Sequence, residues 1–583
     1  MKIRRGIPVV DGIVIAEAFV LEFENYRLPT QRFEQAQPPS AERAAIEQGR
    51  FFKAVASAKV EVEEIKERIS GEVSPEVAGV LEFQTGLYDD ETFHEYVRQQ
   101  ILEGTSPEHA VSKRVTAYRK QFSTSPFTLR LLPDLDDFEH RLLRHLLGEK
   151  RESLKDLTSP VIVIARDLTP QQAAELPRQW VLGFATDHGG KTSHTAILAQ
   201  SLHVPAVVGL GSITGDVTGG ELVILDGREG KVIVDPDEAT LRRYRVRQEK
   251  FLAFQRGLDE LRTLPGETLD GHRVHMLANI EYPEEIEQAL KFGAEGIGLY
   301  RTEFLYSEQN PEPSEEDHYT AYVRATELLG PRPLVIRTLD LGADKFVPEG
   351  LGQEQNPFLG CRSIRYCLME REDIFIRQLR AILRVSTRGD VRIMLPMISS
   401  LEELQRAKAM IDEVKADLRR EGHAIREDIP VGIMVEVPSA ALVSDVLARN
   451  ADFFSIGTND LVQYVLAVDR VNQKVQELYQ PAHPAVFRLV LQTIEAARRH
   501  KIPVSICGEV SGDFHFTLPL LGLGLRDFSM APSLIPKIKR FIRSVTAVEA
   551  GRAVDAVLKI EDASHTLEYL EQRAREIDPA FFV

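Results

Sequence analysis

A histidine that follows two glycines is the first side chain in this sequence with a setting suited to a chemical reaction. Residues 189–200 read GGKTSHTAILAQ. The glycines allow a tight turn, and Thr192 and Ser193 are good N-cap residues for the apolar helix that follows. His194 would then lie in the first helical turn, where unpaired N–H groups and the helix dipole favour an anion. The segment predicts that His194 carries a phosphoryl group; the alternative is a structural histidine beside a helix cap.

Charged and polar side chains in the second half of the chain form a second set. Most of them come at or just after the end of a short apolar run. Arginines can hold a carboxylate and a phosphate through paired hydrogen bonds, whereas two carboxylates are hard oxygen ligands suited to Mg2+. Taken singly, each residue also has the ordinary interpretation of a salt-bridged rim residue. The side chains are Arg301, Arg337, Arg362, Arg470 and Asn459, with the carboxylates Glu436 and Asp460.

Cys507 closes another of these runs, in the sequence ICGE. A lone cysteine is most often a small buried hydrophobe. In a site that handles an enolate or a carbanion, however, a thiol can donate a proton to carbon. The residues alone leave both interpretations of Cys507 open.

The elements that would position the second set alternate along the chain from residue 267 onward. Short apolar runs are separated by helical segments, which indicates a parallel sheet. Eight such units favour a (β/α)8 TIM barrel, whose reactive groups gather at the carboxyl ends of its strands. An open, doubly wound sheet is the alternative. The runs span residues 274–280, 296–300, 333–337, 391–397, 431–436, 453–457, 504–507 and 527–530.

The elements around His194 indicate a small α/β domain that is interrupted by helices. Strand-like runs occur in residues 1–22 and return after residue 160, and His194 lies between the second and third of the later runs. Between them, the 3.6-residue periodicity of residues 40–145 predicts two to four helices. A charged stretch over residues 237–262 predicts a connecting helix. The later runs span 161–165, 181–186, 205–209, 221–227 and 231–236.

Composition restricts the class of protein. The chain of 583 residues has a formal net charge of −17 and no basic tract, which argues against a nucleic-acid partner. Its three cysteines exclude a disulfide framework and agree with a reducing cytoplasm. No apolar run approaches the length of about 20 residues that a membrane span needs, and the first residues do not resemble a signal peptide. We therefore expect a cytoplasmic protein without a membrane partner.

One stretch of the helical region is strongly acidic. Residues 61–108 hold thirteen acidic and three basic residues. Such a run is usually a solvated helix face. The alternative is a docking surface for a basic protein partner.

The segment around His194 resembles the phosphohistidine signature of the phosphoenolpyruvate-utilising enzymes. That family includes Enzyme I of the bacterial phosphotransferase system, pyruvate phosphate dikinase and phosphoenolpyruvate synthase, and it usually has arginine at the position of Gln200. The resemblance extends over nearly the whole chain in ordered motifs. The other matching segments read GLYRTEF at 298–304, IRTLD at 336–340, NPFLGCR at 356–362, GIMVEVP at 432–438 and FFSIGTNDL at 453–461.

Within that family the arrangement resembles Enzyme I. Dikinases and synthases place a large nucleotide-binding domain before the phosphohistidine, whereas only about 190 residues precede His194 here. The helical insertion resembles the docking subdomain for HPr, the histidine phosphocarrier protein. The resemblance implies a homodimer and four parts. They are a phosphohistidine domain (residues 1–22 and 151–236), an HPr-docking subdomain (23–150), a linker helix (237–266) and a barrel for phosphoenolpyruvate binding and dimerisation (267–583).

The resemblance also implies a reaction and a role for each residue. Phosphoenolpyruvate would transfer its phosphoryl group to His194 and then to HPr, releasing pyruvate in the first step of sugar uptake. His194 would serve two sites, which requires a swing of its domain about the connecting helix. The implied roles are Mg2+ binding by Glu436 and Asp460, substrate binding by Arg301, Arg337, Arg362, Asn459, Asp460 and Arg470, and protonation of C3 by Cys507.

Other functions remain open on the sequence. Within the family, the chain could be a dikinase-like enzyme with an unrecognised nucleotide site, or an Enzyme I of the nitrogen-regulatory branch. Outside that reaction, it could be a regulatory barrel that senses phosphoenolpyruvate, or a Mg2+-dependent lyase. A lyase, however, would not need His194 in a separate domain.

Overall fold

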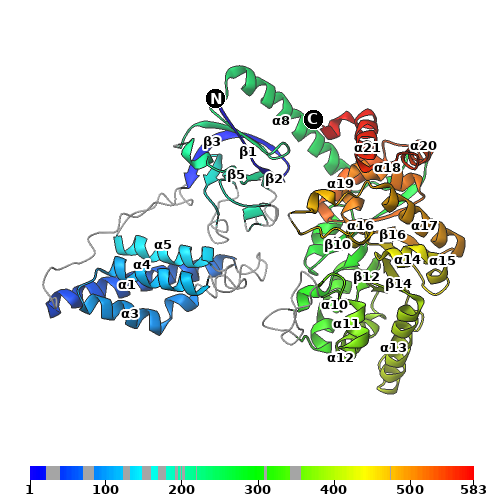
Figure 1. Ribbon diagram of the computed structural model, residues 1–583, viewed down its shortest axis with the longest axis horizontal. Helices are drawn as coiled ribbons and strands as arrows, with labels where there is room; N and C mark the ends of the chain where they lie inside the picture. Colours follow the sequence, from blue (N-terminus) through cyan, green and yellow to red (C-terminus); the bar gives the residue numbers. More distant parts are fainter. Residues whose placement is uncertain are drawn as a thin grey trace. The chain divides into compact units, whose positions relative to one another are not determined.

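The computed structural model divides the chain into two compact units, shown together in Figure 1. The first unit is Met1–Leu252 and the second is Ala253–Val583. The described residues are 1–21, 40–69, 85–122, 132–147, 159–168, 179–190, 193, 195–196, 199, 204–217, 219–306, 312–341, 356–472 and 474–582.

An eight-stranded sheet forms the centre of the α/β part of the first unit. Its strand order is β1-β8-β7-β3-β4-β5-β6-β2. The neighbours β3, β4, β5 and β6 run parallel, and the other pairs are antiparallel. The strands are β1 (Lys2–Arg5), β2 (Ile7–Val10), β3 (Ile13–Leu21), β4 (Val161–Ala165), β5 (Val181–Thr186), β6 (Ala206–Val208), β7 (Leu222–Asp226) and β8 (Lys231–Val234), with a short 3-10 helix η3 (Ile213–Gly215) after β6.

Residues from both ends of the first unit meet in this sheet. Lys2 lies opposite Val234 where β1 pairs with β8, and β3 lies between β7 and β4. The central strand β4 is buried on both faces, with Ile162 in one apolar cluster and Val163 in another. A strand covered on both faces has a continuous apolar sequence, which explains why this strand was predictable.

The helices of the first unit have an apolar core of their own. The helices predicted between residues 40 and 145 are present, and Phe51, Phe93 and Phe138 are buried at their centre. The rings of Phe93 and Phe138 meet edge to face, with centroids 5.2 Å apart. The described helices are α1 (Ala41–Ile69), α3 (Glu91–Leu102), α4 (Pro107–Phe122) and α5 (Leu132–Leu147).

The acidic run of residues 61–108 is not one uniform solvated face. Glu108 is buried and pairs with Arg50 at 2.6 Å. Glu61 pairs with Arg141 at 2.8 Å and also contacts Arg144 and His145. These two acids therefore form ion pairs within the helical bundle, which leaves fewer free charges for a partner.

The connecting helix predicted over residues 237–262 is α8 (Glu238–Glu260). The division between the two units falls within it, after Leu252. Tyr244 belongs to an apolar cluster of the first unit. Phe254 contacts Phe581 of the second unit, with ring centroids 5.2 Å apart. The two halves of this helix thus contribute to two different cores.

The second unit contains the predicted (β/α)8 barrel. Eight parallel strands pair in sequence, and β10 closes the ring by pairing with both β11 and β17, so the open-sheet alternative is wrong. A short strand, β9 (Gly266–Glu267), pairs antiparallel with β10. The barrel strands are β10 (Arg273–Ile280), β11 (Ile297–Tyr300), β12 (Pro333–Arg337), β13 (Asp390–Leu395), β14 (Val431–Val435), β15 (Phe454–Ile456), β16 (Val504–Ile506) and β17 (Asp527–Met530).

Helices surround the barrel and continue beyond it to the C-terminal end of the described chain. None of the described helices in either unit combines the length and apolar character that crossing a lipid bilayer requires. The α-helices are α9 (Glu285–Lys291), α10 (Glu315–Leu329), α11 (Ile364–Met369), α12 (Glu372–Val385), α13 (Leu401–Arg420), α14 (Pro438–Leu442), α15 (Ser444–Leu447), α16 (Thr458–Leu466), α17 (Pro484–His500), α18 (Phe514–Gly522), α19 (Ile535–Ile542), α20 (Ala547–Val557) and α21 (Ala563–Ile577). The 3-10 helices are η4 (Glu303–Leu305), η5 (Gln476–Leu478), η6 (Glu509–Gly512), η7 (Pro532–Leu534) and η8 (Pro579–Phe582).

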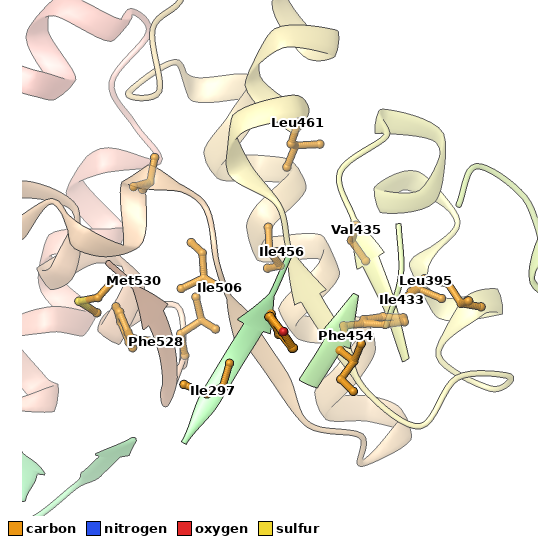
Figure 2. Packing of buried hydrophobic residues seen from close by; sticks show 14 of the residues in the cluster. Ile297, Leu395, Ile433, Val435, Phe454, Ile456, Leu461, Ile506, Phe528 and Met530 are labelled. Carbon is orange, nitrogen blue, oxygen red and sulfur yellow. The ribbon is translucent and has the colours of Figure 1, made fainter. Parts of the chain in front are cut away.

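Side chains alternate along β14 between two apolar layers. Ile433 and Val435 belong to the large core cluster that strands and helices share, part of which Figure 2 shows. Met434, between them, belongs instead to a smaller cluster with Leu299 and Cys507. This period of two places alternate residues of each strand inside the barrel, so the residue after the strand can point over its mouth.

Candidate functional site

The barrel residues predicted for the site converge on one cavity. Its volume is about 550 Å3, and it lies at the carboxyl ends of the strands. Arg337 is the last residue of β12, whereas Arg301, Glu436 and Cys507 each follow directly after a strand. The lining includes all eight predicted barrel residues, which are Arg301, Arg337, Arg362, Glu436, Asn459, Asp460, Arg470 and Cys507.

Arg337 is held rigidly by two carboxylates. Its side chain is buried, its Nη2 donates to Oε1 of Glu303 at 2.6 Å, and its Nη1 lies 2.9 Å from Oδ2 of Asp340. Although burial opposes the charge, these carboxylates and Glu436 keep the pKa of Arg337 above its usual value. Its Nε has no hydrogen-bond partner among the described residues. The guanidinium is therefore fixed in place at the cavity wall, with one N–H that has no partner among the described residues.

Asp340 also holds the second buried arginine. Nη2 of Arg362 donates to Oδ1 of Asp340 at 3.0 Å, and its Nη1 donates to the hydroxyl of Tyr464 at 3.3 Å. Its guanidinium carbon lies 5.9 Å from the ring centroid of Phe358. In the described part of the chain, its Nε also lacks a partner. One carboxylate thus places two guanidinium groups side by side, an arrangement suited to phosphate or carboxylate.

More exposed polar groups complete the cavity wall. Nη1 of Arg301 donates to Glu281 at 2.6 Å, and more than a third of the Arg301 side chain is accessible. The side chain of Asn459 exchanges two hydrogen bonds with Glu509, at 3.1 and 2.8 Å. The backbone N–H of Arg470 donates to the Gln463 side chain at 3.1 Å.

Two buried carboxylates, Glu436 and Asp460, form the acidic part of the cavity. Oε1 of Glu436 accepts the Met397 N–H at 2.6 Å, and burial together with the charges of Asp460 and Asp340 raises the pKa of Glu436 well above its usual range. Oδ1 of Asp460 accepts no hydrogen bond from any described residue, but it forms an ion pair with Nη1 of Arg362 at 3.6 Å.

This pair of carboxylates has the properties of a cation site. Two acids held close together away from water repel one another, and carboxylate oxygens are the kind of ligand that a hard cation prefers. Both features suit a hard divalent cation such as Mg2+. No cluster of three or more possible metal ligands occurs among the described residues. Mg2+ in proteins usually keeps several water molecules and takes further oxygens from a substrate.

Cys507 is a buried thiol at the mouth of the barrel. Its side chain is 3 % exposed, and its Sγ lies 3.6 Å from the carbonyl oxygen of Ile456. Burial raises the pKa of Cys507 to about 11, so the sulfur keeps its proton near neutral pH. A side chain at the next residue, Gly508, would meet Oγ1 of Thr458 at 1.8 Å, so only glycine allows this close approach. The loop thus presents a protonated thiol to the cavity.

The structure does not describe His194, and Gln200 also lies outside the described residues. The segment follows β5, and Thr195 and Ala196 are helical. The Ala196 N–H donates to Oγ of Ser193 at 3.3 Å, which is the N-cap bond that the sequence predicted. The phosphoryl-carrying role of His194 stays a prediction.

Three residues of the site were not predicted as such: Asp340, Glu303 and Tyr464. Asp340 and Glu303 fix the guanidinium of Arg337, and Tyr464 contacts Arg362. A sequence signal existed for the two acids, because each follows a cavity arginine by two or three residues just beyond a strand.

A second cavity lies at the amino ends of four barrel strands. Its volume is about 930 Å3, and Asp390, Val431, Phe453 and Pro503 line it where β13 to β16 begin. Charged groups in its wall pair with one another, as when Arg392 contacts Asp390 at 2.6 Å. In a barrel of this kind the reactive groups belong to the carboxyl end, so the smaller cavity is the candidate site.

Three segments of the chain match models of one known family. Residues 255–547 match the PEP-binding domain of the PEP-utilising enzymes. Residues 157–230 match the mobile domain of the same family, and residues 5–128 match its N-terminal region.

Whole-length relatives were also found. The chain is 40% identical over 572 residues to a phosphoenolpyruvate-protein phosphotransferase of Priestia megaterium, with 97% of this chain and 98% of that protein covered. It is 38% identical over 577 residues to the protein of the same name from Bacillus subtilis (strain 168), with 98% and 100% covered. An NMR solution structure of the Enzyme I (nEIt) protein is 38% identical, with 42% of this chain and 99% of that one covered and a TM-score of 0.37.

Proposed function

Since this chain belongs to the PEP-utilising enzyme family, as a phosphoenolpyruvate–protein phosphotransferase of the Enzyme I type, we propose which of its residues perform each step. Phosphoenolpyruvate binds in the barrel cavity, His194 receives its phosphoryl group, and HPr then takes that group from His194. The observation that carries the proposal is the pair of buried guanidinium groups, Arg337 and Arg362, joined by Asp340.

Phosphoenolpyruvate brings a phosphate and a carboxylate, and the cavity offers cations for both. Arg337 and Arg362 each keep an Nε–H without a partner among the described residues, and Arg301 and Arg470 add further positive charge to the cavity wall. Asn459 contributes an amide. Fixed donors of this kind bind the substrate in one orientation and stabilise the charge that moves during phosphoryl transfer.

The carboxylates Glu436 and Asp460 are the residues that would hold Mg2+. Their burial and their mutual repulsion suit that ion. When bound, Mg2+ neutralises phosphate charge and fixes the substrate geometry. The protein itself holds Glu436 through the Met397 N–H and the close approach of Gly457, and Asp460 through its ion pair with Arg362.

Transfer begins when a ring nitrogen of neutral His194 attacks phosphorus. The new N–P bond forms while the bond from phosphorus to the enol oxygen breaks, which leaves enolpyruvate as its enolate. Cys507 then donates its proton to C3, pyruvate leaves, and the thiolate regains a proton from solvent. The raised pKa of Cys507 supports this role, because the thiol is protonated when the enolate forms.

The four-part division of the chain belongs to the same proposal. Residues 1–22 and 151–236 carry His194, residues 23–150 dock HPr, residues 237–266 link the parts, and residues 267–583 bind substrate and dimerise. Helix α8 spans most of the proposed linker. His194 must then travel between the barrel and HPr, which requires motion about that linker.

Phosphate transfer from phosphoenolpyruvate without nucleotide is the first test of this function. The chain is incubated with 32P-labelled phosphoenolpyruvate and Mg2+, and the acid-labile label is mapped. Label on His194 is the expected result. Label that requires ATP would instead indicate a dikinase, and pyruvate release without labelled protein would indicate a lyase.

Replacement of Cys507 by alanine is expected to slow pyruvate formation by roughly 10²- to 10⁴-fold, the usual effect of losing a general acid. The KM for phosphoenolpyruvate should change little, because the thiol does not pair with the substrate anions. Steady-state pyruvate formation measures both constants. Cys367→Ala is the matched control, since Cys367 is also a buried cysteine of the barrel but is not part of the cavity wall. Normal turnover in Cys507→Ala would return Cys507 to a packing role.

Removal of the helical segment is expected to leave phosphoryl transfer from phosphoenolpyruvate to His194 intact but to stop the transfer from His194 to HPr. Residues 22–158 would be replaced by a flexible linker of about a dozen residues, the length needed to join the parallel neighbours β3 and β4. Labelling of His194 by phosphoenolpyruvate should persist, whereas transfer to HPr should stop. The amount of labelled HPr over time measures the second step. HPr labelled at the normal rate would place its docking surface elsewhere.

A further inference from the structure

We propose that Gln378 is a positioning residue for the substrate arginines, because its side-chain amide joins the loop after β11 to the loop after β12 through a buried hydrogen-bond network. The inference rests on the proposed function of the barrel cavity. Gln378 lies in α12 and does not line that cavity. It would act on phosphoenolpyruvate only through the residues that it holds.

The amide of Gln378 makes three hydrogen bonds, all inside the protein. Its Oε1 accepts the backbone N–H of Leu339 at 2.9 Å. Its Nε2 donates to Oγ1 of Thr302 at 3.0 Å and to the hydroxyl of Tyr322 at 3.1 Å. Gln378, Thr302 and Tyr322 are fully buried. Both amide hydrogens and the carbonyl oxygen thus have defined partners, so the side chain has one orientation.

Two of those partners lie between residues that form the cavity. Thr302 stands between Arg301 and Glu303, and Leu339 stands between Arg337 and Asp340. Oγ1 of Thr302 also donates to the carbonyl oxygen of Arg337 at 3.0 Å. The two loops are therefore joined directly as well as through Gln378.

The joined loops supply both carboxylates that hold the Arg337 guanidinium. Glu303 comes from the first loop and Asp340 from the second. A shift of one loop against the other would separate one carboxylate from Arg337. Because Asp340 also holds Arg362, the same shift would disturb the second guanidinium.

The network continues from Gln378 to the cavity wall, and one direction of donation consistent with its contacts is as follows. The Tyr322 hydroxyl accepts from Gln378, so its own hydrogen can go to Nδ1 of His318, which lies 3.0 Å away. The Nε2–H of His318 then donates to the hydroxyl of Tyr306 at 3.3 Å, and Tyr306 lines the cavity. Burial lowers the pKa of His318 to about 4, so the ring stays neutral and this arrangement is retained at physiological pH.

Gln378 lies on the buried, apolar face of its helix, where an apolar side chain would be enough for packing. Ile374 and Ile382 lie one turn before and one turn after it, and both belong to the buried core. A polar side chain at this position is stable only because every polar atom is satisfied. The amide therefore fixes the two loops relative to one another, which an apolar side chain at this position would not do.

Gln378→Met removes the amide and keeps an unbranched chain of similar length. We expect kcat/KM for phosphoenolpyruvate to fall about 10- to 100-fold, the size of effect that misplaced binding groups produce. The KM should rise with it. Transfer in reverse, from phosphorylated HPr to His194, uses only the first unit under the proposed function and should keep its normal rate.

Three further variants separate positioning from folding. Thr493→Val removes a buried hydroxyl from α17 that bonds only to Leu489 within its own helix; it should lower thermal stability without changing kcat/KM. Thr302→Val should show a non-additive effect with Gln378→Met, since both act through one network. Gln378→Glu, which retains one donor only when protonated, should have intermediate kcat/KM that declines as pH rises.

The outcomes distinguish this inference from the proposed function. A wild-type chain that is not labelled by phosphoenolpyruvate would overturn the function itself. A labelled wild type with normal kcat/KM in folded Gln378→Met would overturn only the positioning role. If Gln378→Met does not fold, additive effects of Thr302→Val and Gln378→Glu, or a flat pH profile of Gln378→Glu, would overturn it equally.

Discussion

His194→Ala is expected to abolish the uptake of phosphate from phosphoenolpyruvate, by roughly 10³-fold or more, as the loss of a catalytic nucleophile does. In the proposed mechanism, His194 is the side chain that forms the covalent intermediate. Transfer in reverse from phosphorylated HPr should be lost to the same extent, because both partners use one imidazole. Acid-labile label on the protein, counted after a fixed time with each donor, measures the two reactions.

The matched control is His188→Ala. His188 is an exposed histidine of the loop that follows β5, six residues before His194. It should retain normal labelling with both donors, and both variants should unfold at the wild-type temperature. Labelled protein in His194→Ala, or loss of label in His188→Ala alone, would show that the phosphoryl carrier has been wrongly assigned.

Glu436→Gln is expected to reduce phosphoryl transfer by roughly a hundredfold or more, because a metal ion contributes several kcal/mol of charge stabilisation in such sites. The amide keeps the shape of the carboxyl group but removes its charge, and with it a ligand for Mg2+. Titration with Mg2+, followed by the temperature of unfolding, gives a reading that is independent of activity. Wild-type protein should be stabilised by the ion, whereas the variant should respond far less.

The same substitution should stabilise the protein when Mg2+ is absent. Burial and the charges of Asp460 and Asp340 raise the pKa of Glu436, so the folded state holds its proton more tightly than the unfolded chain does. Folded stability therefore decreases as pH rises above the ordinary carboxyl range. Glutamine has no proton to lose, so its advantage in stability should be larger at about pH 8 than at about pH 5.

Glu295→Gln, which removes an acid paired with Arg273, is the control and should affect neither metal response nor turnover. Full activity in Glu436→Gln would exclude Glu436 as a metal ligand.

The barrel and most of its cavity were predictable because the local pattern of apolar and polar residues marks each strand and its end. Strands buried on both faces must be apolar throughout, so the residue where polarity returns marks the strand end. Parallel strands bring all such ends to one side of the sheet, and Arg337, Glu436 and Cys507 indeed line one cavity. These residues lie up to 170 positions apart in the chain, yet the parallel arrangement of the strands brings them together.

The network behind the cavity could not be predicted in the same way. His318, Tyr322 and Gln378 lie on helices, where polar residues usually face water. The spacing of Gln378 from Ile374 and Ile382 did place it on the apolar face, which was a usable signal. Its partners, however, come from two loops, and only three-dimensional packing shows that Thr302 and Leu339 meet it.

Order of synthesis matters for the first unit, because its sheet joins residues that the ribosome makes far apart in time. Lys2 pairs with Val234, and β3 cannot gain its neighbour β7 until Asp226 has been made. The contacts of α1, α3, α4 and α5 span much shorter stretches of chain, which favours early folding. We expect the helical bundle to be complete while the sheet is still open. The nascent chain would then carry a folded helical bundle while the early strands of the sheet have not yet paired with β7 and β8.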